Sequence, residues 1–238
     1  MLTCMKVIAV LPAFNAEKTI HKTYAAIPKD SVHEIILVDD ASVDKTVEVA
    51  HEIPDLITIV HESNQGYGGN QKTCYTEALR RGADVVIMIH PDFQYDPTYL
   101  PRMLAPIIEG RADFVSGSRF LKGDPRQQGM VWWRYWGNRF LTTMQNLVLG
   151  LHLSEGHSGY RAYSRKLLQR VVYQTFSNTF VFDSEMLAAV ARSGFVICEV
   201  PIPTRYTAES SSIAFWPSVL YGLLTLKTLL WSTGETKR

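Results

Sequence analysis

Four runs of mostly apolar residues divide the first part of the chain. They lie at residues 6–11, 34–38, 56–60 and 87–89, and each is followed by a polar or glycine-containing stretch. Short apolar runs bounded by turn residues are typical of strands buried on both faces, as in a parallel sheet. Helix-forming segments separate the runs, so the pattern predicts an α/β fold with a mostly parallel, Rossmann-like sheet flanked by helices.

Capping and strand-breaking residues predict where these elements begin and end. Pro12 is expected to end the first strand. Asn15 can then cap a helix that reaches Ile27, and Ser42 can cap a helix from about Lys45 to His51. These boundaries describe repeated strand–turn–helix units.

Polar side chains follow two of the apolar runs directly. Asp39 and Asp40 come after the second run, and His90, Asp92 and Gln94 come after the fourth. The carboxyl ends of parallel strands meet at one edge of a sheet, where α/β enzymes bind ligands. A carboxylate such as Asp92 can bind a divalent cation, and that cation can neutralise a nucleotide diphosphate. The pattern therefore predicts a ligand site at this edge.

A glycine cluster follows the third run. Gly66, Gly68 and Gly69 precede a helix expected from about residue 71 to 81, with Lys72 in its first turn. Glycines allow a backbone to approach a ligand closely or to adopt positive φ, although a flexible turn is an equal alternative. The spacing fits neither a Walker loop nor a dinucleotide fingerprint, which disfavours nucleoside triphosphatases and dehydrogenases.

Composition limits the function classes further. The chain has 238 residues, 46% of them hydrophobic, which suits one compact domain. With 24 Lys and Arg against 23 Asp and Glu, no overall charge favours nucleic-acid binding. Three widely spaced cysteines fit neither a disulfide framework nor a zinc cluster. With no signal peptide and no apolar run long enough to span a bilayer, we expect a cytoplasmic protein.

Six motifs, in order between Val7 and Ser212, carry a family resemblance. They are Leu11–Glu17, Val38–Thr46, Asn64–Gly66, Val115–Arg119, His157–Arg161, and Arg205 with Ser210–Ser212. In this order they resemble family 2 glycosyltransferases, and most closely the dolichol-phosphate mannose synthase branch, which transfers sugar to polyprenyl phosphates. The resemblance implies a GT-A fold over residues 1–212 and inverting transfer from a nucleoside diphosphate sugar of UDP or GDP type.

The resemblance also assigns residues to the donor nucleotide. They lie in the first three strand-end turns, namely Pro12, Ala13, Asn15, Glu17, Asp39, Asp40, Gly66, Gly69 and Lys72. Paired acids beside an apolar strand need solvent or hydrogen-bond partners, which a base or ribose can supply. Each residue also has a structural alternative, such as a strand end, a helix N-terminus or a turn.

The metal motif departs from the family pattern. Asp92 matches the last acid of the family's D-x-D element, and Gln94 matches a polar neighbour, but His90 replaces the first acid. A neutral imidazole can still bind a metal, and it suits Mn²⁺ better than Mg²⁺. His157 also stands where the branch tends to have an acid, and three roles stay open for it: a metal ligand, a base or a structural histidine.

Cationic residues later in the chain match positions for phosphate groups. The resemblance places Arg119, Arg134 and Asn138 at an acceptor phosphate and Arg205 at the donor diphosphate, where guanidinium groups bind well. A phosphate acceptor needs no strong base, whereas a hydroxyl acceptor needs a carboxylate, for which Asp183 and Glu185 are candidates.

Three functions follow from these alternatives. The preferred one is transfer to a polyprenyl phosphate. The second is transfer to a saccharide or another hydroxyl acceptor in glycan synthesis. The third is a catalytically silent nucleotide-sugar-binding protein, which the substitutions at His90 and His157 suggest.

Aromatic and apolar residues gather in two late segments. Residues 132–136 combine tryptophans with Arg134, and residues 215–231, within a C-terminal segment at 213–238, place apolar residues at helical spacing. Such compositions suit peripheral contact with the inner face of a membrane. A helix packed on its own core or in a homodimer is an equal alternative.

Overall fold

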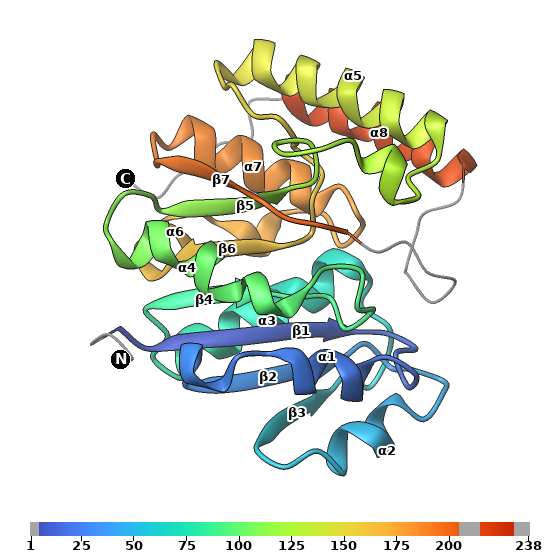
Figure 1. Cartoon of the computed structure of the whole chain (residues 1–238), viewed down its shortest axis with the longest axis vertical. Coiled ribbons are helices and arrows are strands. Elements are labelled where there is room, and N and C mark those ends of the chain that lie inside the picture. The colour runs from blue at the N-terminus through green and yellow to red at the C-terminus, as the bar shows by residue number, and fades with distance from the viewer. Residues whose placement is uncertain (1–4, 205–214, 231–238) are drawn as a thin grey trace.

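A computed structural model describes residues 5–204 and 215–230 (Figure 1). Its centre is a seven-stranded sheet in the order β3-β2-β1-β4-β6-β5-β7. The strands are β1 (Val7–Ala13), β2 (Glu34–Asp39), β3 (Leu56–Val60), β4 (Val85–Met88), β5 (Phe114–Ser118), β6 (Arg161–Ser164) and β7 (Ile197–Pro201). Only β6 runs antiparallel to its neighbours, so the mostly parallel sheet expected from the apolar runs is confirmed.

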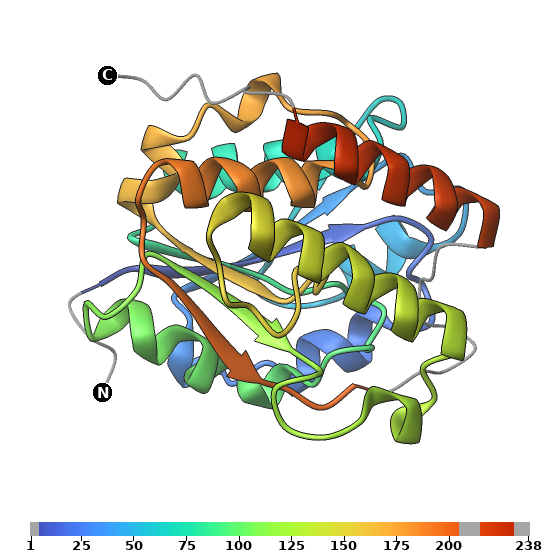
Figure 2. The same cartoon turned by 90° about the horizontal axis from the view of Figure 1, so that it is seen from above.

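Helices cover both faces of this sheet (Figure 2). They are α1 (Ile20–Ala26), α2 (Thr46–His51), α3 (Tyr67–Arg80), α4 (Leu100–Ile108), α5 (Trp132–Leu149), α6 (Arg165–Arg170), α7 (Phe182–Arg192) and α8 (Phe215–Leu230). Four short 3₁₀ turns join them, at Lys29–Ser31, Pro97–Tyr99, Pro125–Gln128 and Tyr173–Thr175.

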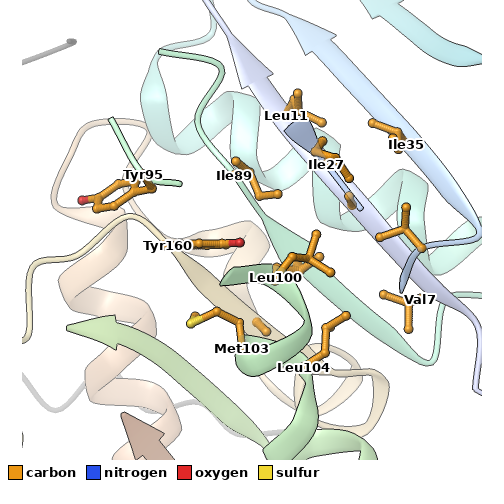
Figure 3. Close-up of a cluster of buried hydrophobic side chains, with 14 of the residues drawn as sticks. Val7, Leu11, Ile27, Ile35, Ile89, Tyr95, Leu100, Met103, Leu104 and Tyr160 are labelled. Atoms are coloured by element: carbon orange, nitrogen blue, oxygen red, sulfur yellow. The ribbon is translucent and has the colours of Figure 1, made fainter. Parts of the chain in front are cut away.

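Alternate residues of β1 supply two separate cores. Val7 and Leu11 pack with α4 on one face, together with Ile35 of β2 (Figure 3). Ile8 and Val10 pack on the opposite face, in the core that contains residues of α3, α6 and α7. Because successive side chains of a strand point to opposite faces, a continuous apolar run is required where both faces are covered.

Pro12 does not end the first strand, contrary to the sequence-based expectation. β1 continues to Ala13 and stays in register with β2. The carbonyl of Val10 accepts from Ile89 on the β4 side, and the missing N–H of Pro12, two residues later, would face that side too. β4 has already ended at Met88, so no ladder hydrogen bond is lost there.

The predicted helix caps were also wrong. Asn15 adopts a φ of 51°, and α1 begins five residues later at Ile20. The backbone N–H of Asn15 donates to Ser42 Oγ at 2.8 Å, while the Asn15 side chain accepts from the N–H of Val43 at 3.0 Å. Both proposed caps therefore link the β1–α1 and β2–α2 loops to each other.

Three helices form a layer beside the β5–β7 half of the sheet. α5 contacts both α7 and α8, and α8 also contacts α7, as both views show (Figures 1 and 2). The helical spacing expected for the C-terminal apolar segment is therefore present in α8. Within residues 5–204 and 215–230, no helix has both the length and the apolar character needed to cross a bilayer.

Candidate active site

A cavity of about 460 Å³ opens where the turn after β4 meets α5, α7 and α8. Its inner wall is polar and includes the buried side chains of Asp92, Arg119 and Asp183. Its outer wall is apolar, and there Phe140 of α5 and Leu223 of α8 are also exposed to solvent. The cavity therefore joins a charged interior to an apolar entrance between two helices.

Eight of the predicted site residues line this cavity, although they come from distant parts of the sequence. They are His90, Asp92, Gln94, Arg119, Arg134, Asn138, His157 and Asp183. The residues predicted for metal and acceptor are thus brought together. Arg205 lies outside the described residues, as do Ser210–Ser212 of the same motif.

The residues predicted for the donor nucleotide lie beside the cavity and not in its lining. Asp40 is buried, and its carboxylate accepts from Gln65 N at 2.7 Å, from Gly66 N at 2.9 Å and from His61. Asp39 accepts from Ser42 N at 2.9 Å. Both acids hold the strand-end turns in shape.

Glu17 makes a similar link between turns. Its carboxylate accepts from Lys45 N at 3.0 Å, and its own N–H donates to Asp44 at 3.2 Å. The carbonyl of Ala13 accepts from Asp40 N and from the side chain of Asn70. Together with Pro12, these residues form a cross-linked set of turns at the carboxyl edge of β1 and β2.

The glycine cluster packs tightly against a neighbouring loop. α3 begins at Tyr67, earlier than predicted, after Gly66 with a φ of 83°. A Cβ added at Gly68 would lie 2.3 Å from the carbonyl oxygen of Ser177, and one added at Gly69 would lie 2.8 Å from the Gln65 side chain. Lys72 donates to the carbonyl of Phe176. The positive φ expected in this cluster is present at Gly66, and the cluster is also a close-packing site, a role that the sequence reasoning did not include.

His90 belongs to a chain of hydrogen bonds that enters the protein interior. Its Nε2 lies 3.2 Å from the hydroxyl of Tyr67, which donates to Asp183 Oδ2 at 2.8 Å. Burial lowers the pKa of His90 below its ordinary value, and the charges of Asp92 and Asp183 oppose this shift. The ring is therefore neutral near pH 7 and can offer a lone pair.

Asp92 and Gln94 are held in a tight turn. Asp92 Oδ1 accepts from Gln94 N at 2.9 Å, and Phe93 between them has a φ of 54°. Both flanking side chains line the cavity as a result. The turn presents one carboxylate and one amide oxygen at the end of β4.

His157 has a buried ring nitrogen without a partner. Its Nδ1 lies 2.7 Å from the hydroxyl of Tyr221 in α8, while Nε2 has no hydrogen-bond partner. Burial, and then the charges of Arg161 and Arg119, lowers the pKa of His157 to about 3. His157 also lines the cavity, and a neutral imidazole with an unpaired nitrogen is suited to a metal or a ligand proton.

These residues fit a divalent cation that is shared with a substrate. Over residues 5–204 and 215–230, no three His, Cys, Asp or Glu side chains converge closely enough to hold a metal by themselves. Mg²⁺ and Mn²⁺ in nucleotide sites are commonly held by one or two protein groups plus substrate phosphates. Asp92 and Gln94, with one imidazole from His90 or His157, supply such a partial set.

Arg119 and Asn138 meet at Glu155, a residue that the sequence reasoning missed. The fully buried carboxylate of Glu155 accepts from Arg119 Nε at 2.7 Å, from Arg119 N at 2.8 Å and from Asn138 Nδ2 at 2.8 Å. The only sequence signal was an acid two residues before His157. Much of the positive charge of Arg119 is therefore balanced inside the protein.

The two candidate bases are placed differently. Asp183 lines the cavity, but Tyr67, Gln71 and Arg161 occupy its oxygens. Glu185 points elsewhere and accepts from Ser177 N at 2.7 Å. Burial raises the pKa of Glu185, which is outside the cavity lining. The predicted pair is therefore not brought together.

The sequence of this chain is similar to those of known glycosyltransferases. The family model described as Glycosyl transferase family 2 matches residues 8–172. A UDP-N-acetylglucosamine–dolichyl-phosphate N-acetylglucosaminyltransferase of Methanococcus voltae is 29% identical over 92% of this chain and 94% of its own length. An undecaprenyl-phosphate mannosyltransferase of Micrococcus luteus is 30% identical, covering 83% of each chain.

Solved structures share the fold. Glucosyl-3-phosphoglycerate synthase of Mycobacterium tuberculosis, in complex with Mn²⁺, UDP-glucose and phosphoglyceric acid, matches with a TM-score of 0.72 at 22% identity. The match covers 95% of this chain and 79% of that one, and it confirms the predicted GT-A fold. Because the family model matches more than half of this chain, the chain belongs to glycosyl transferase family 2.

Proposed function

We propose that this glycosyltransferase moves a sugar, with inversion, from a nucleoside diphosphate sugar to a polyprenyl phosphate. The observation that carries the proposal is a cavity that combines a polar inner wall with an apolar entrance between α5 and α8. A polyprenyl phosphate matches this cavity, because its anionic head group suits the polar inner wall and its apolar chain suits the apolar entrance. The acceptors named for the two relatives, dolichyl phosphate and undecaprenyl phosphate, are of this class.

The acceptor phosphate would lie near the cationic groups of the cavity. Arg134 lines it from α5, and Arg119 lines it from the end of β5. Guanidinium groups suit phosphate oxygens because they donate two parallel hydrogen bonds. Asn138 and Arg119 both donate to the carboxylate of Glu155, so Asn138 can help to orient the acceptor phosphate at Arg119.

The positions of the candidate bases favour a phosphate acceptor over a hydroxyl. Asp183 is occupied by three neighbouring side chains, and Glu185 is outside the cavity. A phosphate oxygen already carries charge, so it attacks the sugar C1 without losing a proton to a base. The new O–C1 bond forms as the bond from C1 to the diphosphate oxygen breaks. The electron pair leaves with the nucleoside diphosphate, and the configuration at C1 inverts.

A divalent cation, Mn²⁺ or Mg²⁺, would be held by Asp92 and Gln94 with His90 and His157 nearby. When bound, it stabilises the negative charge on the departing diphosphate. The turns formed by Pro12–Glu17, Asp39–Asp40 and Gly66–Gly69 would place the nucleoside beside the cavity, with Lys72 in the following turn of helix. We propose UDP as the first nucleotide to test, because the named donor of the Methanococcus voltae relative is UDP-N-acetylglucosamine.

The proposal is tested with the purified chain, a panel of UDP- and GDP-sugars, and a short polyprenyl phosphate, with Mn²⁺ or Mg²⁺. Mass spectrometry should detect a glycosylated polyprenyl phosphate when either the UDP-sugars or the GDP-sugars are the donors, but not both. No product should form when the acceptor is the unphosphorylated polyprenol. Transfer to polyprenol or to a saccharide would overturn the acceptor assignment. Calorimetric binding of a donor without turnover on any acceptor would favour a nucleotide-sugar-binding protein instead.

We also propose that the face formed by α5 and α8 lies on a lipid bilayer. Both helices carry exposed aromatic and aliphatic side chains, namely Trp132, Trp136, Phe140, Trp216, Val219, Leu220 and Leu223, and three of these, Phe140, Val219 and Leu223, also line the cavity. Tryptophan is favoured at the boundary between lipid head groups and acyl chains. A bilayer at this face would deliver the acceptor directly to the entrance.

The triple variant Trp132→Ser, Trp136→Ser and Trp216→Ser should co-sediment with vesicles about tenfold less well, because three large apolar side chains no longer enter the interface. Val196→Ser removes an exposed apolar side chain from the residue just before β7, away from α5 and α8, and this control should bind as before. Equal vesicle binding by the triple variant would contradict the placement. If light scattering showed that the unsubstituted protein is a dimer and the triple variant a monomer, the face would instead bind a second copy of this chain.

A further inference from the structure

His90 presents a problem that an aspartate would not. A carboxylate can bind a cation through either oxygen, whereas a neutral imidazole has one lone pair, on whichever ring nitrogen lacks the proton. The protein must therefore set the tautomer before His90 can act in the metal motif.

The hydroxyl of Tyr67 determines where the proton of His90 lies. It donates to Asp183 Oδ2 at 2.8 Å, and a carboxylate can only accept. A tyrosine hydroxyl carries its proton near neutral pH and can therefore act as the donor. With that proton directed to Asp183, the contact of 3.2 Å with His90 requires His90 Nε2 to be the donor.

Both partners of Tyr67 are fixed in place. Asp183 also accepts from Gln71 Nε2 at 3.3 Å and lies 3.4 Å from Arg161 Nη1, a fully buried cation. The Tyr67 ring stacks on His90, with ring centroids 5.5 Å apart and an interplanar angle of 21°. The side chain therefore has little freedom to turn its hydroxyl elsewhere.

The glycine cluster explains how Tyr67 reaches this position. Tyr67 is the first residue of α3, and Gly68 beside it packs against the loop that precedes α7. A Cβ at Gly68 would lie 2.3 Å from the Ser177 carbonyl oxygen and 2.8 Å from Phe182 Cβ. The absence of a side chain lets the first turn of α3 approach the first turn of α7, which carries Asp183.

We propose that Tyr67 is a positioning residue that, with Asp183, holds His90 with Nε2 protonated and leaves the Nδ1 lone pair for the divalent cation. This inference rests on the proposed function, which supplies the cation. Asp183 thereby contributes its negative charge through two hydrogen bonds in place of the acid missing at position 90. An imidazole nitrogen in the ligand set favours Mn²⁺ over Mg²⁺.

The test is Tyr67→Phe, which keeps the ring and removes the hydroxyl. Long-range nitrogen NMR of the metal-free protein, with the His90 signal identified through His90→Gln, should show the Nε2-protonated form in the unsubstituted protein and a tautomer mixture in the variant. Calorimetry with UDP present should show Mn²⁺ affinity lowered about 10- to 100-fold. Tyr173→Phe, which removes a buried hydroxyl bonded to Thr76, is the matched control and should change neither measurement.

A double-mutant cycle separates positioning from general destabilisation. In the His90→Gln background, Tyr67→Phe should leave Mn²⁺ affinity unchanged, because its effect acts through His90. An unchanged tautomer in Tyr67→Phe, or an equal loss of affinity in both backgrounds, would overturn the inference. Absence of Mn²⁺ binding by the unsubstituted protein would instead overturn the metal assignment of the proposed function, and the NMR measurement would still decide the role of Tyr67.

Discussion

Replacing Asp92 by asparagine is expected to lower the rate of sugar transfer by about 100- to 1000-fold. Asparagine keeps an oxygen that can accept from Gln94 N, so the turn after β4 should survive. The change removes the one carboxylate of that turn that lines the cavity, and with it the charge that holds a cation at the departing diphosphate. Steady-state kinetics over a range of Mn²⁺ concentrations measures the loss.

Asp96→Asn is the matched control for this change. Asp96 lies four residues later, outside the cavity lining, and its side chain accepts from Thr98 N at 3.0 Å. The same chemical substitution there should leave transfer close to that of the unsubstituted protein. If Asp92→Asn kept full activity, the metal assignment in the turn after β4 would be wrong.

Glu155→Gln should lower the free energy of unfolding by about 3–5 kcal/mol. Glu155 is fully buried and Arg119 is 8% exposed, so the substitution leaves a buried guanidinium without its opposite charge. Glutamine has nearly the same shape, which means that the loss comes from charge and hydrogen bonding and not from a cavity. Urea denaturation of the two proteins measures the difference.

An exposed ion pair provides the comparison. Glu109 pairs with Arg111, both side chains are more than half exposed, and Glu109→Gln should cost less than about 1 kcal/mol. In a double-mutant cycle, Arg119→Met should recover part of the loss caused by Glu155→Gln, because no unpaired buried charge would remain. A cost for Glu155→Gln as small as that for Glu109→Gln would refute the view that Glu155 balances Arg119.

Local boundaries were the least predictable part of the fold. Asn15 and Ser42 have the residue types of helix caps, yet they bond to each other's loops, and α1 begins at Ile20. Pro12 has the residue type of a strand end, yet β1 passes through it because β4 stops earlier. For Asn15 and Ser42, a neighbouring loop supplies the hydrogen-bond partner that a helix cap would have used. For Pro12, the neighbouring strand has already ended, so no backbone hydrogen bond is needed there.

The sequence predicted individual residues of the candidate site but not which of them bond to one another. His90, Asp92 and His157 could be identified as chemically capable residues, and the structure brings them to one cavity. Nothing in the sequence linked Arg119 to Glu155, which lies 36 residues later. Pairing of this kind depends on how β5 and the segment before β6 are arranged, and short-range patterns carry no such information.

By itself, the sequence determined the α/β class, the four strands of the first half and the sheet edge where the polar turns lie. Strands covered on both faces must be continuously apolar, and polar residues can follow only where such strands end. Only the tertiary structure decided that Tyr67, His90 and Asp183 form one hydrogen-bonded chain, and that α5 and α8 together line the entrance of the cavity. The physical reason is that hydrophobic periodicity fixes which face of an element is buried, whereas the crossing of packed helices and strands fixes which polar atoms come within bonding distance.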